Sequence, residues 1–301
     1  MSVRLAMHIG GTYPMLYAFF DGKGALRREG VSRQVEAAVA CGASGIAVLG
    51  LGTEAHKLGR EERRALVEWT LADTAGRLPV AVTVGEGNVP DMVESARFAE
   101  AAGARWLILQ PPRPPASGED LIRVFGAVAD SVQCPVAIQN APEFLGIGLS
   151  SAELIELNRR HANVTIVKAE TTAVGVARTI EALAGRMAVF NGRAGLELTD
   201  NFRAGVDGMI PGVETIDLQI SVERAMRAGD EALAESLYRQ MLPAVCFAMQ
   251  GLAHLVLYGK LIAAHRLGIA PSGTRAPSDI ASPLGMSTAA RLAAELGPLP
   301  A

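Results

Sequence analysis

The sequence Val164-Thr-Ile-Val-Lys-Ala-Glu170 has the composition of a short buried strand, because β-branched and apolar residues lead up to a lysine and a glutamate. Side chains alternate between the two faces of a strand, so Lys168 shares a face with Ile166 and Glu170. Burial disfavours the charged form of an amine, and this is how a lysine becomes a nucleophile toward carbonyl groups. A structural ion pair between Lys168 and Glu170 is the alternative interpretation.

Further strand patterns occur at regular intervals along the chain, each followed by a helical pattern. The expected strands lie at residues 13–20, 45–50, 78–85, 106–110, 134–140, 164–170, 187–191 and 206–211. Among the connecting segments we expect a turn at residues 21–24, a helix at 60–74 and a helix that opens at Pro90. Eight such units predict an α/β protein, a (β/α)8 TIM barrel in residues 1–216.

The strand patterns stop after Gly212. Residues 217–301 are therefore expected to form a C-terminal helical extension packed on the barrel. Its expected helices include residues 231–241 and 287–296, separated by a Pro/Gly/Ser-rich loop at residues 270–283.

Composition excludes several classes of protein. The net charge of -3 and the absence of a Lys/Arg cluster argue against a nucleic-acid partner. Cys41, Cys134 and Cys246 are far apart, which is typical of reduced core cysteines and not of a disulfide framework or a metal site. No signal peptide or long apolar run is present, so a cytoplasmic protein without a membrane partner is expected. The histidines show no metal-ligand spacing, and we expect neither a metal nor a cofactor.

Catalytic residues of such barrels lie at the C-terminal ends of the strands. That rule selects residues 50–54, 110–113, 139–140, 168, 170–171, 191–193 and 210–214. The loop from Gly50 to Thr53 offers backbone amides and a hydroxyl suited to a carboxylate, although it could be an ordinary turn. Arg193 could neutralise a substrate carboxylate or pair with a loop acid.

The segment Gly45-Ile-Ala-Val-Leu-Gly-Leu-Gly-Thr-Glu-Ala-His-Lys-Leu-Gly-Arg-Glu-Glu-Arg63 resembles the second-strand signature of the dihydrodipicolinate synthase and N-acetylneuraminate lyase family. Lys168, in Ile-Val-Lys, stands where that family keeps its Schiff-base lysine. Several motifs keep their order and spacing between about Tyr13 and Ile220. The resemblance implies a barrel with C-terminal helices, a covalent role for Lys168 and a homotetramer built as a dimer of dimers.

Departures from the family pattern restrict the reactions that can be expected of this chain. Gln139 replaces the fifth-strand tyrosine that shuttles protons in the family, and Leu51 and Gly52 replace its paired hydroxyl residues. Pro112 and Arg113 likewise replace a tyrosine pair after the fourth strand. The family's relay is therefore missing, and replacing Tyr13 or Tyr17 is expected to leave turnover intact.

Two further features bear on the substrate. Phe144 stands where the synthase keeps an arginine for its substrate, so dihydrodipicolinate synthesis is not expected. Gln139-Asn-Ala-Pro142 and Lys168-Ala-Glu-Thr171 are similar to motifs of the 2-keto-3-deoxy-L-arabonate dehydratase branch. The substrate that this resemblance implies is a small 2-keto acid.

The expected reaction is dehydration of a 2-keto-3-deoxy sugar acid. Lys168 forms an imine with the 2-keto group, Glu170 removes a C3 proton or only sets the charge state of Lys168, and Gln139 orients a hydroxyl or a water. The expected substrate-binding residues are Gly50, Leu51, Gly52, Thr53, Asn140, Thr171, Gly192, Arg193 and Ile210. A retro-aldol lyase that releases pyruvate, and a non-catalytic keto-acid sensor, are the alternatives.

Overall fold

The computed structural model describes residues 9–112, 117–270 and 275–300. Arg113 and part of the loop expected at residues 270–283 lie outside the described residues. The strands form one parallel sheet of 8 strands in the order β1-β8-β7-β6-β5-β4-β3-β2. They are β1 (Gly11–Thr12), β2 (Ile46–Val48), β3 (Val80–Val84), β4 (Trp106–Leu109), β5 (Val136–Asn140), β6 (Val164–Ala169), β7 (Ala188–Asn191) and β8 (Gly208–Met209).

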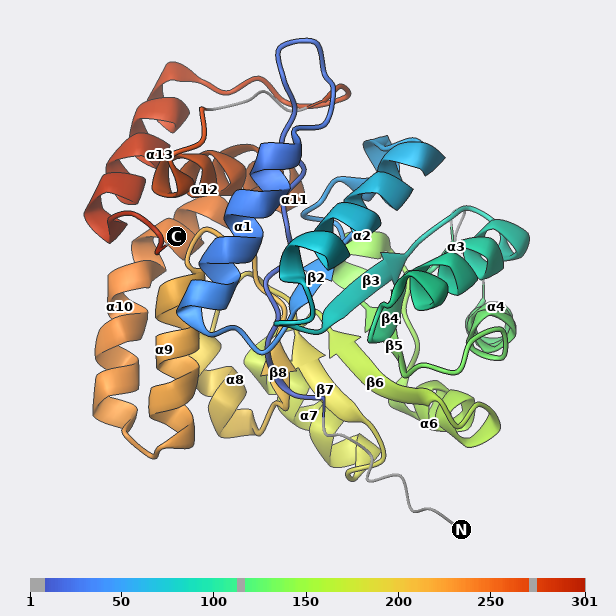
Figure 1. Ribbon diagram of the computed structural model, residues 1–301. Coiled ribbons are helices and arrows are strands. Elements are labelled where there is room, and N and C mark those ends of the chain that lie inside the picture. Colours follow the sequence, from blue (N-terminus) through green and yellow to red (C-terminus); the bar gives the residue numbers. More distant parts are fainter. Residues whose placement is uncertain (1–8, 113–116, 271–274, 301) are drawn as a thin grey trace.

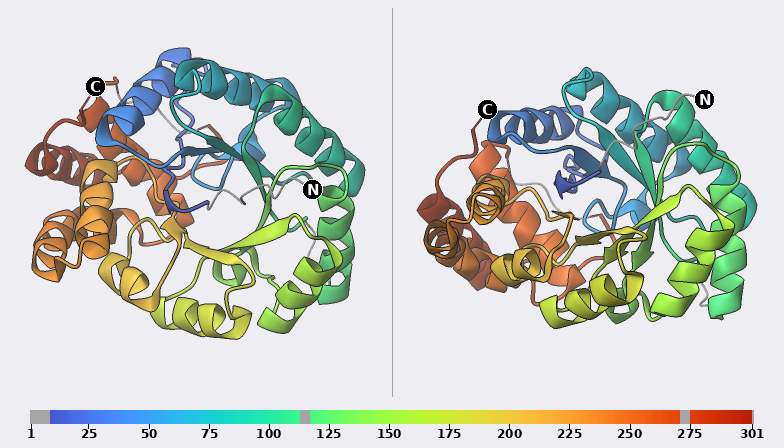
Figure 2. Two further views of the ribbon diagram at one scale, coloured as in Figure 1. Left: turned by 60° about the horizontal axis from the view of Figure 1, so that its bottom comes forward. Right: turned by 90° about the horizontal axis from the view of Figure 1, so that it is seen from below.

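Helices between the strands, and one after β8, surround this sheet. They are α1 (Arg28–Cys41), η1 (Ala55–Lys57), α2 (Arg60–Thr74), α3 (Val89–Ala102), α4 (Gly118–Ala129), α5 (Pro142–Leu145), α6 (Ser151–Arg160), α7 (Ala173–Leu183), α8 (Leu198–Ala204) and α9 (Ile216–Arg227). Figure 2 shows them as a ring around the central strands. The predicted (β/α)8 barrel is confirmed, and each expected strand from the second to the eighth overlaps an observed one.

Local sequence explains where individual helices begin. The helix expected at residues 60–74 is α2, whose Glu62 carboxylate accepts the N–H of Gly59 at 2.9 Å. Helix α3 follows Asn88, whose side chain accepts the N–H of Asp91 at 2.9 Å, and it carries Pro90 in its first turn as expected.

The strand expected at residues 13–20 is wrong in its position. The ladder runs through Gly11 and Thr12, and the segment that follows rejoins the sheet at Met15, which pairs with Ala47 of β2 and closes the barrel. Tyr13 and Met15 still donate to the Met209 and Pro211 carbonyls, whereas Pro14 between them has no N–H to donate toward β2. The remaining apolar residues cross the mouth of the barrel as a buried loop up to the turn at residues 21–24, which is confirmed.

The C-terminal helices pack on one side of the ring, at the left of Figure 1. They are α10 (Glu231–Ala248), α11 (Leu252–His254), the π-helical turn η2 (Leu255–Gly259), α12 (Lys260–Leu267) and α13 (Pro283–Leu296). The expected helices at residues 231–241 and 287–296 are parts of α10 and α13. The division into residues 1–216 and 217–301 stays a proposal, and it falls at the start of α9, which packs against α1 and α8 of the ring.

Aromatic and aliphatic side chains fill the interior of the barrel below the strand ends. The rings of Tyr13 and Trp106 lie 5.3 Å apart between centroids, and those of Trp106 and Phe190 lie 5.6 Å apart. Ile166 of β6 belongs to this interior cluster. Lys168 comes two residues later on the same strand, so its side chain lies above the cluster, toward the mouth.

The structure also bears on the expected cysteine environment and on membrane-spanning segments. All three cysteines are free, but Cys246 is exposed and is not a core residue as expected, because it lies on the outer face of α10. Among the described residues no single helix has the length and apolar character needed to cross a membrane. By length and composition alone a pair bent by 106°, Glu231–Ala248 with Leu252–Leu267, passes the same test.

Candidate active site

Lys168 and Glu170 form a buried ion pair at the mouth of the barrel. The side chains are each 4% exposed, and Lys168 Nζ lies 2.7 Å from Glu170 Oε1. The two residues share a face of β6, as the alternation of the strand predicted. Such a carboxylate can take a proton from the amine, and the neutral amine can then attack a carbonyl carbon.

Gln139 fixes the far side of this carboxylate. It lies opposite Lys168 in the register of β5 and β6, and its Nε2 donates to Glu170 Oε2 at 3.0 Å. Its Oε1 is buried and accepts no hydrogen bond from any described residue. The amide therefore holds Glu170 and leaves one acceptor for a ligand hydroxyl or a water.

Gly192, at the end of β7, leaves room for the ion pair. A Cβ atom at this position would lie 2.5 Å from Lys168 Cε and 2.6 Å from Glu170 Oε1. Both distances are shorter than any ordinary contact, so a side chain here would displace the two groups. The glycine expected from the sequence as a substrate-binding residue thus borders the reactive groups directly.

The loop after β2 offers fewer donors than the sequence suggested. Gly50 N–H points to Met15 Sδ at 3.2 Å, and the Thr53 hydroxyl donates to the Leu16 carbonyl at 2.6 Å. Thr53 is fully buried, so its hydroxyl holds the loop and does not face a ligand. Leu51 and Gly52 are the loop residues whose N–H groups donate to no described residue.

Three other expected binding residues point elsewhere. Asn140 donates to the Leu149 carbonyl at 2.9 Å and accepts its N–H at 2.8 Å, so both groups of its amide hold the loop after β5. Arg193 pairs with Glu143 at 3.3 Å and with Glu197 at 3.4 Å, the loop-bridging alternative. Thr171 packs against the start of α7.

A cavity joins the remaining residues, and we call it the lysine cavity. Six of the expected residues belong to its wall: Leu51, Gly52, Lys168, Glu170, Gly192 and Ile210. The wall also contains residues that were not predicted to bind substrate: Met15, Tyr17, Phe144, Ala194, Pro211, Gly212, Met249, Leu252 and Leu255. Three of these come from the C-terminal helices, so the barrel alone does not complete the cavity.

Tyr17 and Glu214 form a second buried pair beside this cavity. The Tyr17 hydroxyl donates to Glu214 Oε2 at 2.7 Å, and Glu214 Oε1 has no hydrogen-bond partner among the described residues. Burial raises the pKa of Glu214, and burial together with Glu214 holds the pKa of Tyr17 well above its ordinary range. Residues 210–214 were a predicted strand end, but nothing in the sequence places Tyr17 next to it.

A buried cluster supports the loop after β2 from behind. Glu54 is fully buried, and its carboxylate pairs with Lys57 at 2.6 Å and with Lys260 of α12. Burial lowers the pKa of Lys260, whereas its pairing with Glu54 opposes that shift. The C-terminal helices therefore also hold the residues that lead out of β2.

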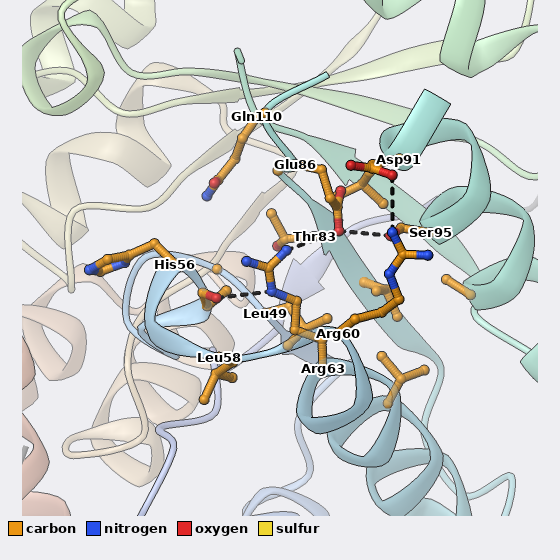
Figure 3. Close-up of a pocket in the computed structure, with 18 of the residues that line it drawn as sticks. Leu49, His56, Leu58, Arg60, Arg63, Thr83, Glu86, Asp91, Ser95 and Gln110 are labelled. Atoms are coloured by element: carbon orange, nitrogen blue, oxygen red, sulfur yellow. Dashed lines mark hydrogen bonds and ion pairs between the residues drawn. The ribbon is translucent and has the colours of Figure 1, made fainter. Parts of the chain in front are cut away.

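A larger cavity of about 450 Å³ lies on the other side of Leu51, and we call it the arginine cavity. Arg63 donates to Glu86 at 3.2 Å and to the Ala55 carbonyl at 3.0 Å, so the two charged side chains meet across the cavity in Figure 3. Because the Arg63 charge is already paired, an anionic ligand there would compete with Glu86.

A lysine and a carboxylate buried together at the C-terminal mouth of a (β/α)8 barrel form the arrangement expected of enzymes that work through a covalent imine. Residues 8–277 match the Dihydrodipicolinate synthetase family, and the chain belongs to this family. Its members are lyases, aldolases and synthases among them, that use a Schiff-base mechanism, and this chain is therefore a Schiff-base lyase.

Individual relatives agree with this assignment. The chain is 29% identical over 238 residues to YagE of Escherichia coli K12, whose name carries a provisional assignment as a 2-dehydro-3-deoxy-D-gluconate aldolase; the match covers 77% of this chain and 79% of YagE. It is 28% identical over 239 residues to the 4-hydroxy-tetrahydrodipicolinate synthase of Agrobacterium fabrum, covering 77% and 80%. The crystal structure of Escherichia coli YagE with pyruvate superposes with a TM-score of 0.87 at 24% identity, over 96% of this chain and 98% of that one.

Proposed function

We propose that this lyase dehydrates a 2-keto-3-deoxy sugar acid through an imine on Lys168. The observation that carries the proposal is the arrangement of Lys168, Glu170 and Gln139 within hydrogen-bonding distance in one buried group. A base stands next to the imine nitrogen, and an amide occupies the fifth-strand position in register with the lysine. An amide cannot relay a proton. This arrangement therefore favours elimination of water that begins with loss of a C3 proton over cleavage of a carbon–carbon bond, which needs a proton relay on β5.

In the proposed reaction Glu170 first accepts a proton from Lys168, whose neutral amine adds to the 2-keto carbon. Glu170 returns this proton to the carbinolamine hydroxyl, which leaves as water, so the protonated imine forms and Glu170 is again a carboxylate. The protonated imine acidifies the protons at C3. Glu170 then removes one of them, because its carboxylate lies beside the nitrogen that carries the substrate. The C3 electron pair expels the C4 hydroxyl, which leaves as water, and hydrolysis of the imine releases the product.

Substrate binding in this proposal uses three kinds of group. The free N–H groups of Leu51 and Gly52 hold the substrate carboxylate, and the free Oε1 of Gln139 accepts a substrate hydroxyl. The apolar side chains of Phe144 and Leu255 line the cavity and limit the access of water to the imine.

Aldol cleavage to pyruvate and an aldehyde is the second candidate. It is supported by the aldolase assignment of YagE, and it would proceed through the same imine. It requires a base at the C4 hydroxyl, and the products distinguish it from dehydration because only the aldol route releases pyruvate.

Borohydride trapping followed by peptide mapping tests the proposal. We expect 2-keto-3-deoxy-L-arabonate or 2-keto-3-deoxy-D-gluconate to leave a reduced adduct on Lys168, and turnover to give a dehydrated keto acid without pyruvate. Lys168→Met should give no adduct, whereas Lys23→Met, which changes an exposed lysine in the turn at residues 21–24, should behave as the unmodified enzyme. Pyruvate among the products would replace dehydration by the aldol route, and the lack of any adduct would overturn both.

A further inference from the structure

We propose that Tyr17 is the general acid that protonates the departing C4 hydroxyl, and that Glu214 supplies the replacement proton to Tyr17. This inference rests on the proposed dehydratase function. It assigns a catalytic role to a residue outside the strand ends and reverses the expectation that Tyr17 can be replaced without loss of turnover.

The proposed reaction needs an acid that Lys168, Glu170 and Gln139 do not supply. Hydroxide is a poor leaving group, so its departure requires a proton from a nearby side chain. Among the described residues that line the lysine cavity, the side chains that can exchange protons are Tyr17, Lys168 and Glu170. Lys168 holds the substrate and Glu170 takes the C3 proton, so Tyr17 remains as the donor.

The position of the Tyr17 hydroxyl is fixed by two glycines. A Cβ atom at Gly212 would lie 2.6 Å from the Tyr17 hydroxyl and 2.1 Å from Glu214 Oε2. A Cβ atom at Gly259 would lie 2.8 Å from the same hydroxyl. Any larger residue at either position would occupy the space of the Tyr17–Glu214 pair, and Gly212 belongs to the wall of the lysine cavity as Tyr17 does.

The surroundings of Glu214 favour its protonated form. Its carboxyl group is fully buried, and one of its oxygens has no partner among the described residues, which is costly for an ionised group. The charged residues that face the pair are Glu54, which Lys260 and Lys57 neutralise, and Arg266, which donates to the Glu214 carbonyl and pairs with Asp217. In the neutral carboxyl the proton is on Oε1, because Oε2 accepts from Tyr17 at 2.7 Å. A half-turn of the carboxyl group presents this O–H to the Tyr17 oxygen once Tyr17 has given its own proton away.

The proton and electron balance of the step is complete. The C3–H bond breaks and its proton goes to Glu170, while its electrons form the enamine. The enamine electrons expel the C4 oxygen, which takes the Tyr17 proton as the C4–O bond breaks. Glu214 returns a proton to Tyr17, so Glu170 ends with one proton more and Glu214 with one fewer. Exchange with solvent restores both after water and product leave.

A comparison of two leaving groups tests the inference. Tyr17→Phe and Glu214→Gln are assayed with 2-keto-3-deoxy-L-arabonate and with its 4-deoxy-4-fluoro analogue, since fluoride departs with much less proton assistance. For Tyr17→Phe we expect a loss of about 100-fold or more in water elimination, a much smaller loss in fluoride release, and undiminished borohydride trapping on Lys168. Glu214→Gln should show the same pattern with a smaller loss.

Control measurements make each outcome decisive. Tyr238→Phe removes a hydroxyl that accepts the Glu197 N–H away from the lysine cavity, and it should leave both eliminations unchanged. Equal losses for both substrates in Tyr17→Phe would mean that Tyr17 only positions the substrate. Water elimination at the rate of the unmodified enzyme would mean that Tyr17 is not the acid. Either result overturns this inference and leaves the proposed function intact. Pyruvate production by the unmodified enzyme would overturn the proposed function, and this inference with it.

Discussion

Gly192 shows how closely the residues around Lys168 fit together. Replacing it by alanine places a methyl group within 2.6 Å of the Lys168 and Glu170 side chains, and both must shift. Because a displacement of about 1 Å can cost about 100-fold in rate, we expect Gly192→Ala to lower kcat/KM by about 10- to 100-fold. Steady-state kinetics measures this loss.

Gly22→Ala is the matched control, because a Cβ atom at Gly22 contacts no atom within 4 Å. It should leave kcat/KM and the free energy of unfolding unchanged, whereas crowding in Gly192→Ala should cost about 1–3 kcal/mol in urea unfolding. Undiminished turnover in Gly192→Ala would show that the ion pair can move without loss of function and would contradict the prediction.

Glu214 should give the stability of the protein a recognisable pH dependence. Burial raises its folded-state pKa above the ordinary value of 4.5, so the folded protein keeps this proton at pH values where the unfolded chain has lost it. The contribution is fully present below pH 4.5 and is lost as the pH rises toward the folded pKa. Each pH unit in this window costs about 1.4 kcal/mol of unfolding free energy.

Urea unfolding between pH 5 and pH 8 measures this effect. The free energy of unfolding should decline more steeply with rising pH in the unmodified protein than in Glu214→Gln, whose amide does not titrate. Parallel curves for the two proteins would mean that Glu214 is ionised in the folded state.

Alternation along β6 was enough to predict that Lys168 and Glu170 share a face, because period-2 geometry is a local property of the chain. Asn140 and Arg193 could not be judged in the same way. Each lies at a strand end as expected, but its hydrogen bonds go to Leu149 and to Glu143 and Glu197. Which partner a polar side chain finds depends on loops whose paths the sequence pattern does not specify.

At the scale of elements, helices with clear boundary signals were the most predictable. α2 begins after a glycine and carries Glu62 in its first turn, and its bounds follow from the sequence. The bounds of the first strand were not predictable, since residues 13–20 have the aromatic composition of a strand throughout but leave the sheet after Leu16 and continue as a buried loop. Composition indicates that a segment is buried, whereas pairing depends on available N–H groups.

Arg266 of α12 ties the C-terminal helices to the barrel. It donates to both carboxylate oxygens of Asp217, at 2.9 and 2.7 Å, and also to the Glu214 carbonyl at 2.7 Å, with its side chain fully buried. A lysine keeps the charge but cannot make these bonds together. We expect Arg266→Lys to lower the free energy of unfolding by about 3 kcal/mol, measured by urea denaturation.

Arg291→Lys provides the comparison, because Arg291 pairs with Glu295 at 2.6 Å on the exposed face of α13. Its cost should stay below about 0.5 kcal/mol. Similar costs for the two substitutions would show that Arg266 acts as an ordinary surface residue and that other contacts hold α12 in place.

At the scale of the whole molecule, the repeat of strand and helix predicted the barrel, but it did not predict that the extension would complete the cavity. Met249, Leu252 and Leu255 reach a site formed by strands encoded much earlier in the chain. Such long-range contacts have no periodic signal. The pairing of Tyr17 with Glu214 escaped prediction for the same reason.

The family resemblance also supports a proposal about assembly, namely a homotetramer built as a dimer of dimers. Light scattering coupled to size-exclusion chromatography should give a mass four times that of one chain. A monomer at micromolar concentration would contradict this prediction. A stable dimer would mean that only one of the two expected interfaces forms.

Completion of the cavity by the C-terminal helices has a consequence for the newly made chain. The ribosome produces Lys168 before it produces Met249, Leu252 and Leu255, so the lysine is made before the residues that complete its cavity. A chain whose synthesis stops between these points has the residues of the barrel but lacks three residues of the cavity wall. The order of synthesis therefore makes docking of the last helices the step that completes the lysine cavity.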